Sequence, residues 1–363
     1  MKKYWLSALL ITASLLTVIY SCGSDDPVTE YIPLPESPVV LDVNAVPYAK
    51  LSDYNFFDGD IKNLQPVYGV LPYDLNSGLF SDYAEKKRFV WMPAGQNAQY
   101  VADGQVLDFP EGTALIKNFY YKNLQPGNTT RIIETRLLIK KGSGWIMANY
   151  VWNEGQTEAL LNTTGGTVPL SILQDGETLP INYKIPNHDQ CMECHMQNDI
   201  EMPIGPKPQN LNKNFTYADG SQNQLAKWKS FGYLDSYPGN ILTTVNWRDA
   251  SQPLETRVRS YLDVNCAHCH TTGAECGNTP MNLAFGQSSL PQNLGICREP
   301  IEFVTGTEQY IVDGQDIDNS LMYYRMSNKI QSEMMPPIGR TTIDFEALEL
   351  MEEWINSLDN QCP

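Results

Sequence analysis

Two pentapeptides of the form Cys-x-x-Cys-His limit what this chain can fold into more than any other feature. They lie at residues 191–195 and 266–270. Two thiols at this spacing can each add to a vinyl group of a haem, and the histidine that follows then presents its imidazole to the iron. The sequence therefore predicts two haems c. The predicted attachment cysteines and iron-binding histidines are Cys191, Cys194 and His195 in the first motif, and Cys266, Cys269 and His270 in the second.

Two other chemistries use closely spaced cysteine pairs. Four thiolates from two such pairs can bind zinc, but a zinc site would leave both trailing histidines unexplained. A redox pair of the thioredoxin type is expected beside a βαβ pattern, and neither motif lies in one. Exported chains are also where haem is attached to such motifs, so the export signal described next favours haem over zinc.

The N-terminus has the pattern of an export signal. Two lysines precede an apolar run at residues 5–20, which is short for a bilayer span. The run ends in Ile-Tyr-Ser before Cys22, which resembles the lipobox of bacterial lipoproteins. We therefore expect residues 1–22 to hold a lipoprotein signal and its lipidation site, Cys22, and the Pro-rich residues 23–45 to be a tether. The predicted location is the outer membrane, facing either the periplasm or the cell surface, with membrane contact through the lipid only.

The chain is strongly acidic. Its formal charge is −17, and loss of the two leader lysines makes the mature chain −19. Such a charge repels a phosphate backbone, so nucleic acid is excluded as a partner. Redox proteins with basic docking surfaces are the expected partners.

Residues 46–185 form the predicted β-rich domain. Apolar and polar residues alternate between turn signals in three runs, at residues 114–121, 131–139 and 144–152. The spacing of the turns predicts antiparallel meanders in a sandwich or barrel-like domain. No histidine precedes His188, so the region offers no metal cluster or catalytic triad.

Residues 250–363 have the order of a small helical haem domain. Apolar residues at helical spacing predict one helix directly before Cys266 and a second over residues 346–358. A Met-Met-Pro-Pro-x-Gly loop lies between them. This order resembles a class I cytochrome c, in which a methionine before proline is the sixth iron ligand. The resemblance assigns that role to Met335, opposite His270, with Met334 as the alternate.

The first motif has fewer neighbours of known role. Residues 186–249 form a first haem segment with a turn before the motif, an irregular Pro-rich loop after it and a helix at residues 222–231. Its sixth iron ligand stays open between two residues. Met202 precedes a proline, but seven residues must then reach around the haem, near the limit of about 3.3 Å per residue. His188 is the other option, and a loop histidine without a ligand role explains it equally well.

Eight cysteines include three that the motifs and the lipobox leave over. Cys276 and Cys297 both follow the second motif in one loop, so we predict a disulfide between them. Cys362, near the C-terminus, would then be free.

The chain as a whole resembles a family of uncharacterised two-haem c-type cytochromes with a β-rich N-terminal region. The resemblance rests on residues 51–54, 78–83 and 134–138 and on both haem motifs. It implies a multidomain fold, in which a mostly-β domain precedes α-helical cytochrome c-like domains. The predicted function is transfer of single electrons between redox partners, as a carrier more than as an enzyme. Two alternatives stay open: a β domain that binds or converts a substrate and is coupled to the cytochrome, and a haem peroxidase-like enzyme.

Overall fold

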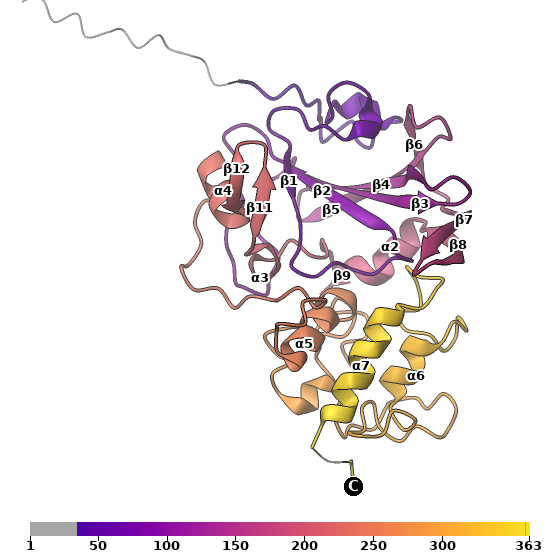
Figure 1. Cartoon of the computed structure of the whole chain (residues 1–363). Coiled ribbons are helices and arrows are strands. Elements are labelled where there is room, and N and C mark those ends of the chain that lie inside the picture. The colour runs from indigo at the N-terminus through magenta and orange to yellow at the C-terminus, as the bar shows by residue number, and fades with distance from the viewer. Residues whose placement is uncertain (1–34, 360) are drawn as a thin grey trace, which may run out of the picture. The chain divides into compact units, whose positions relative to one another are not determined.

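The computed structural model describes residues 35–359 and 361–363 (Figure 1). The predicted leader and Cys22 lie outside the described residues. Residues 37–363 form one compact unit, with the strands in its first half and the longer helices near its end. Within the described part of the chain, no helix is long and apolar enough to cross a membrane.

An eight-stranded antiparallel sheet dominates the first half, which confirms the prediction of a β-rich region. Its strands pair in the order β1-β2-β3-β4-β5-β6, and the β7–β8 hairpin joins at β3. The three alternating runs of the sequence are β3, β4 and β5, joined by tight turns at the predicted Pro-Gly and Gly-Ser-Gly positions. The strands are β1 Leu71–Tyr73, β2 Glu85–Trp91, β3 Ala114–Leu124, β4 Thr129–Lys141, β5 Gly144–Trp152, β6 Ala159–Asn162, β7 Gly166–Gln174 and β8 Glu177–Ile185.

Both faces of this sheet are covered for much of their area. One face buries Phe89, Ile116 and Leu137 against the N-terminal residues 46–70. Each of these side chains is fully buried, and burial of one such side chain contributes about 1.5–3 kcal/mol. The opposite face packs Val90 and its neighbours against the indole of Trp228. Farther along this second face, Lys117 and Arg136 are not covered in this way and line the cavity described below.

The α-helices of the described residues lie in the second half of the chain. They are α2 His188–His195, α3 Pro208–Leu211, α4 Gln224–Phe231, α5 Leu254–Asn265, α6 Leu321–Ser327 and α7 Phe345–Ser357, with short strands β9 Met196–Gln197, β10 Ile200–Glu201, β11 Asn214–Tyr217 and β12 Gly220–Asn223. The predicted helices before Cys266 and near the C-terminus are α5 and α7, and the helix predicted at residues 222–231 is α4. The two helices α5 and α7 pack on each other through the buried side chains Val258, Leu262 and Met351. Tyr261 and Asn265 of α5, and Asp344 directly before α7, line the cavity described below.

Helix α2 carries the first motif, where the sequence analysis gave only a turn. Asn187 caps it: the Asn187 side chain accepts a hydrogen bond from the Gln190 N–H at 2.9 Å, and the Gln190 side chain accepts one from the Asn187 N–H at 3.2 Å. This reciprocal capping box was readable in the sequence as Asn-x-x-Gln. It sets the first turn of the helix and so the spacing of the two cysteines.

Candidate functional site

Both motifs border one cavity of about 410 Å³. The cavity lies between the sheet, helix α2 and the segments that precede and follow α5. Its lining includes five of the six predicted attachment and iron-binding residues, together with Met335. The five are Cys191, Cys194, His195, Cys266 and His270; Cys269 is not part of the lining, but its neighbour His268 is. Residues that are far apart in the sequence therefore meet at one site.

In the first motif, a hydrogen bond at Nδ1 fixes the ring of His195. Its Nδ1 hydrogen-bonds the carbonyl oxygen of Met202 at 2.7 Å, and the Met202 N–H donates to the His195 carbonyl at 2.6 Å. Desolvation lowers the pKa of His195 to about 3, so the imidazole is neutral at neutral pH. A neutral ring whose Nδ1 is bound presents Nε2 as the free nitrogen, as a metal-binding histidine requires.

The backbone of Met202 lies at the Nδ1 side of the His195 ring, away from the nitrogen that would face a metal, and Met202 is not part of the cavity lining. His188, the alternative ligand, is exposed at the start of α2 and lies outside the lining. The sixth iron ligand of the first motif therefore stays a prediction. Met147 and His268 do line the cavity, and the sequence analysis assigned a role to neither.

The second motif follows α5 in a tight turn. The N–H groups of Cys269 and His270 both donate to the carbonyl of Cys266, at 3.1 and 2.9 Å. The His270 Nδ1 lies 3.2 Å from the hydroxyl oxygen of Thr279, and desolvation lowers the pKa of His270 to about 4. This imidazole is therefore also neutral and held by its Nδ1.

The two motifs touch each other. Ligand atoms of Cys194, His268 and Cys269 all lie within 4.8 Å of one another, and they are the one such group of three among the described residues. A hydrogen bond with Cys269 lowers the pKa of the Cys194 thiol. The His268 Nδ1 is buried and has no hydrogen-bond partner within the described chain. Since Cys191 and Cys266 are outside this group, the four motif sulfurs do not converge on one point, as a four-thiolate zinc site needs.

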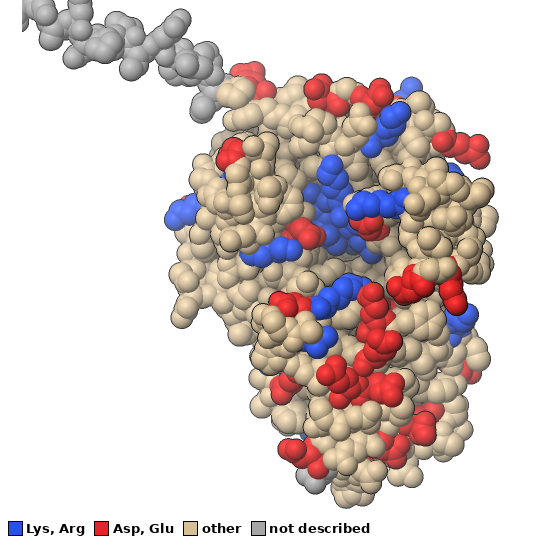
Figure 2. All heavy atoms as spheres, viewed as in Figure 1, with Lys and Arg blue, Asp and Glu red and all other residues tan. Residues whose placement is uncertain are grey.

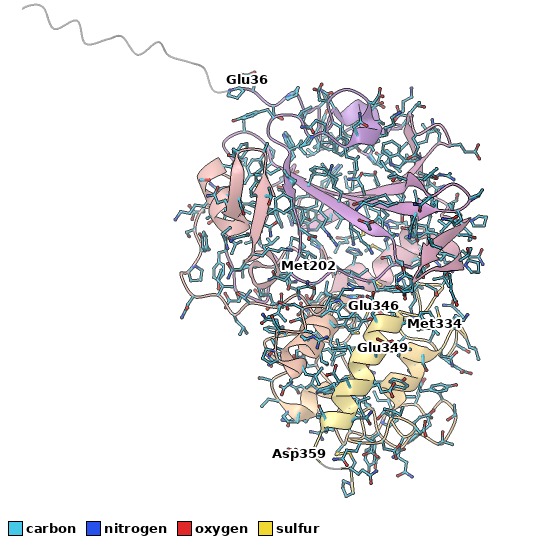
Figure 3. The ribbon with its side chains drawn as sticks, in the orientation of Figure 1. Glu36, Met202, Met334, Glu346, Glu349 and Asp359 are labelled. Carbon is cyan, nitrogen blue, oxygen red and sulfur yellow. A yellow bond between two sulfur atoms is a disulfide. The ribbon has the colours of Figure 1, made fainter. Side chains whose placement is uncertain are left out.

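The two methionines of the Met-Met-Pro-Pro loop have different surroundings. Met335 lines the cavity, whereas Met334, which is labelled in Figure 3, is 4% exposed and is not part of the cavity lining. The guanidinium of Arg340 donates to the Met335 carbonyl at 3.0 and 3.2 Å and so fixes this loop. Of the two methionines, Met335 is therefore the one at the cavity.

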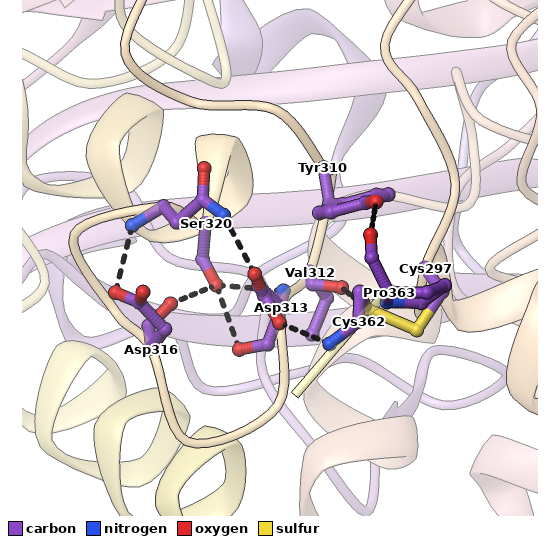
Figure 4. Close-up of a disulfide and its surroundings, with 9 residues drawn as sticks. Cys297, Tyr310, Val312, Asp313, Asp316, Ser320, Cys362 and Pro363 are labelled. Atoms are coloured by element: carbon purple, nitrogen blue, oxygen red, sulfur yellow. Dashed lines mark hydrogen bonds between the residues drawn. A yellow bond between two sulfur atoms is a disulfide. The ribbon is translucent and has the colours of Figure 1, made fainter. Parts of the chain in front are cut away.

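The disulfide differs from the prediction. Cys297 pairs with Cys362, at a Cα–Cα distance of 5.2 Å, and Cys276 is free (Figure 4). The reason is that the C-terminus folds back onto the domain: the Cys362 N–H donates to the Asp313 carboxylate at 2.7 Å, and the Tyr310 hydroxyl donates to the carbonyl of Pro363. Cys276 is instead held close to the second motif, where its N–H donates to the Cys269 carbonyl at 3.1 Å.

The sheet contributes residues that the sequence analysis did not single out. Lys117 and Arg136 line the cavity, and the side-chain amide of Asn149 reaches the Cys191 sulfur at 4.0 Å. All three lie in the alternating runs that predicted strands, so the signal for a polar face was present. No signal in the sequence indicated which strands would be neighbours or the register in which they would pair.

Comparisons with family models, curated proteins and solved structures find no match for this chain.

Proposed function

We propose that this chain is a two-haem c-type cytochrome that transfers single electrons between redox partners. The observation that carries the proposal is the meeting of two Cys-x-x-Cys-His motifs at one cavity, with the sulfurs of Cys194 and Cys269 within 4.8 Å of each other. Haem iron cycles between its ferric and ferrous states and so supplies one-electron chemistry. The chain's own residues would hold two such groups as immediate neighbours.

The residues present fit this cofactor. The thiols of Cys191, Cys194, Cys266 and Cys269 are all free to form thioethers. His195 and His270 are neutral, each with its Nδ1 engaged, so each can bind iron through Nε2. Met335 is the proposed sixth ligand on the second haem, since it lines the cavity in a loop that Arg340 fixes.

We also propose the finer fold assignment that the resemblance implies. Residues 250–363 would be the class I cytochrome c-like domain, because α5, the second motif, the methionine loop and α7 follow in that order. Residues 186–249 would hold the first haem with walls borrowed from the sheet. Asn149 and Arg136 of the sheet support this, since both line the cavity beside Cys191.

A haem enzyme is the second candidate. It is favoured by the first motif, because neither Met202 nor His188 is placed to be its sixth ligand. Spectra of the purified ferric and ferrous protein with added peroxide and carbon monoxide separate the two functions. Two low-spin haems that do not react support the carrier, whereas a haem that binds carbon monoxide and consumes peroxide supports the enzyme.

Haem content tests the proposal directly. Protein matured in an exporting host should keep two haems per chain after denaturation and extraction with acidified acetone, because thioether bonds survive unfolding. The paired variants C191A/C194A and C266A/C269A should each keep one. Recovery of haem-free protein with bound zinc, by metal analysis, would instead support the thiolate alternative.

The proposed partners are redox proteins with basic docking surfaces. Glu346 and Glu349 of α7 and Asp359 beyond it are exposed along one side of the molecule, where Figures 2 and 3 show acidic side chains. Charge complementarity of this kind speeds association and is screened by salt over about 10 Å at 0.1 M. Electron transfer to a basic partner should therefore slow as salt rises.

We further propose that the protein is exported and anchored at the outer membrane through a lipid on Cys22. Replacing this cysteine with alanine removes the group that the lipid would modify. The variant should therefore leave the membrane fraction or remain unprocessed. A variant that is cut at the same position and stays in the membrane fraction would contradict the anchor.

A further inference from the structure

Three cations lie side by side across one face of the sheet. Arg88 of β2 pairs in register with Lys117 of β3, and Lys117 pairs in register with Arg136 of β4. Like charges directly opposite on neighbouring strands destabilise a sheet. Arg88, Lys117 and Arg136, called here the cation row, therefore need a compensating anion, although the chain as a whole has a charge of −17. Figure 2 shows Lys and Arg side chains gathered in a hollow over the sheet.

The neighbouring carboxylates leave the cation row only partly compensated. Asp74 accepts from Arg88 at 2.7 Å but also lies 3.3 Å from the Lys213 ammonium. Glu134 accepts two hydrogen bonds from Arg136, at 3.0 Å from Nε and 2.5 Å from Nη2. Lys117, between the two arginines, has no hydrogen bond or ion pair to any described residue.

One geometric observation indicates that a ligand is missing from the row. Arg88 is 5% exposed, and its Nη2 is buried without a hydrogen-bond partner within the described chain. Burial and the two neighbouring guanidinium groups hold the pKa of Lys117 well below its ordinary value of 10.5. An unsatisfied buried donor such as Nη2 of Arg88 destabilises the fold, and more so when the group is charged.

The cation row borders the first motif. Lys117 and Arg136 line the same cavity as Cys191, Cys194 and His195. Asn149 of β5 pairs in register with Arg136 of β4, and its side-chain amide lies 4.0 Å from the Cys191 sulfur. An anion held by the row would therefore lie beside the haem that we propose for the first motif.

We propose that Lys117 and Arg136, the two residues of the cation row that line this cavity, form a carboxylate-binding site. The inference rests on the proposed function, since it places the carboxylate against the first haem. Neighbouring strands lie about 4.8 Å apart, so Arg136 is close enough to Lys117 for one carboxylate to receive donors from both side chains. The carboxylate belongs either to a propionate of the first haem or to a small organic acid that enters the cavity.

The experiment compares Lys117→Met with Lys87→Met in the holoprotein. Lys87 is the matched control, because it neighbours Arg88 on β2 but is exposed on the opposite face of the strand. Both midpoint potentials are measured by redox titration at constant ionic strength, with and without succinate as the probe. Loss of a cation beside an iron disfavours the less positive ferrous state, so K117M should lower one midpoint and K87M should leave both unchanged.

The succinate arm separates the two sources of the carboxylate. If a propionate fills the site, succinate has no effect on the wild type, while K117M still lowers one midpoint. If a free acid fills it, succinate lowers one midpoint of the wild type in a saturable way, and K117M loses that response. K117M midpoints and succinate response equal to those of K87M would overturn the site.

Haem content keeps this test separate from the proposed function. A full-length chain without haem would refute the proposed function, and the site would then be judged by calorimetric titration with succinate alone. Binding that weakens at least tenfold in K117M but not in K87M would support it, and absence of binding to the wild type would overturn it. K117M should fold with undiminished thermal stability, because it removes a buried like charge.

Discussion

The carboxylate of Asp82 accepts hydrogen bonds from the backbone N–H groups of Thr341 and Thr342, at 2.6 and 2.9 Å, and from the Thr341 hydroxyl at 2.9 Å. Asp82 is 2% exposed and lies in the segment 78–83, between β1 and β2. Arg340, the residue before Thr341, holds the carbonyl of Met335. The β-rich region therefore fixes the loop that carries Met335.

Asp82→Asn should weaken this connection. An amide keeps the shape but places a donor near backbone donors, so we expect a loss of about 1–3 kcal/mol in unfolding free energy. Guanidinium denaturation measures it, with the exposed Asp58→Asn as control. The same variant should perturb the ferric spectrum of the proposed second haem, and an unchanged spectrum and stability would show that the contact does not position the loop.

Met335→Ala and Met334→Ala should affect different properties: the first a midpoint potential, the second the unfolding free energy. The first removes the proposed thioether ligand, which stabilises ferrous iron, so one midpoint falls and the ferric sulfur-to-iron absorption band is lost. The second leaves the spectrum unchanged but empties a buried site, at about 2–5 kcal/mol of unfolding free energy. Redox titration and denaturation of both variants test this. A lowered midpoint in Met334→Ala and unchanged midpoints in Met335→Ala would show that Met334 is the ligand instead.

Cys362→Ser should destabilise the protein, whereas Cys276→Ser should not. The Cys297–Cys362 bridge spans a sequence separation of 65 residues, and a loop of that size is worth about 4 kcal/mol by the chain-entropy estimate. Denaturation curves of the two serine variants give the comparison. Peptide mapping without reductant should join Cys297 to Cys362, and a fragment joining Cys276 to Cys297 would contradict the structure.

Lys86 should make stability depend on pH. Desolvation, with the charges of Arg88, Arg136 and Arg248, lowers its pKa to about 7, and Asp344 opposes the shift. The unfolded chain keeps this ammonium protonated up to about its ordinary pKa of 10.5, so unfolding takes up a proton between these pH values. The unfolding free energy therefore gains a term that rises with pH from about 7.

Lys86→Met removes that term. The variant should exceed the wild type in stability near pH 6, where Lys86 is charged in both states, and the difference should shrink toward pH 9. The exposed Lys141→Met serves as the control. Parallel stability curves for wild type and K86M across this range would mean that Lys86 does not titrate as described.

The features that the sequence predicted correctly are local. Alternation with period two predicted β3, β4 and β5, and apolar residues at helical spacing predicted α5 and α7. Each Cys-x-x-Cys-His motif likewise carries its whole signature in five consecutive residues, and the haem attachment read from it stays a prediction. None of these features needs knowledge of what lies elsewhere in the chain.

Tertiary structure alone decided which distant residues meet. It brought Cys194 to Cys269, Asp82 to Thr341, and Cys362 to Cys297 in place of Cys276. It also set the strand registers that align the cation row, and a slip of one residue would have turned Lys117 to the other face of the sheet. Such pairings depend on how the sheet, helices and loops pack together, and local propensity carries no information about them.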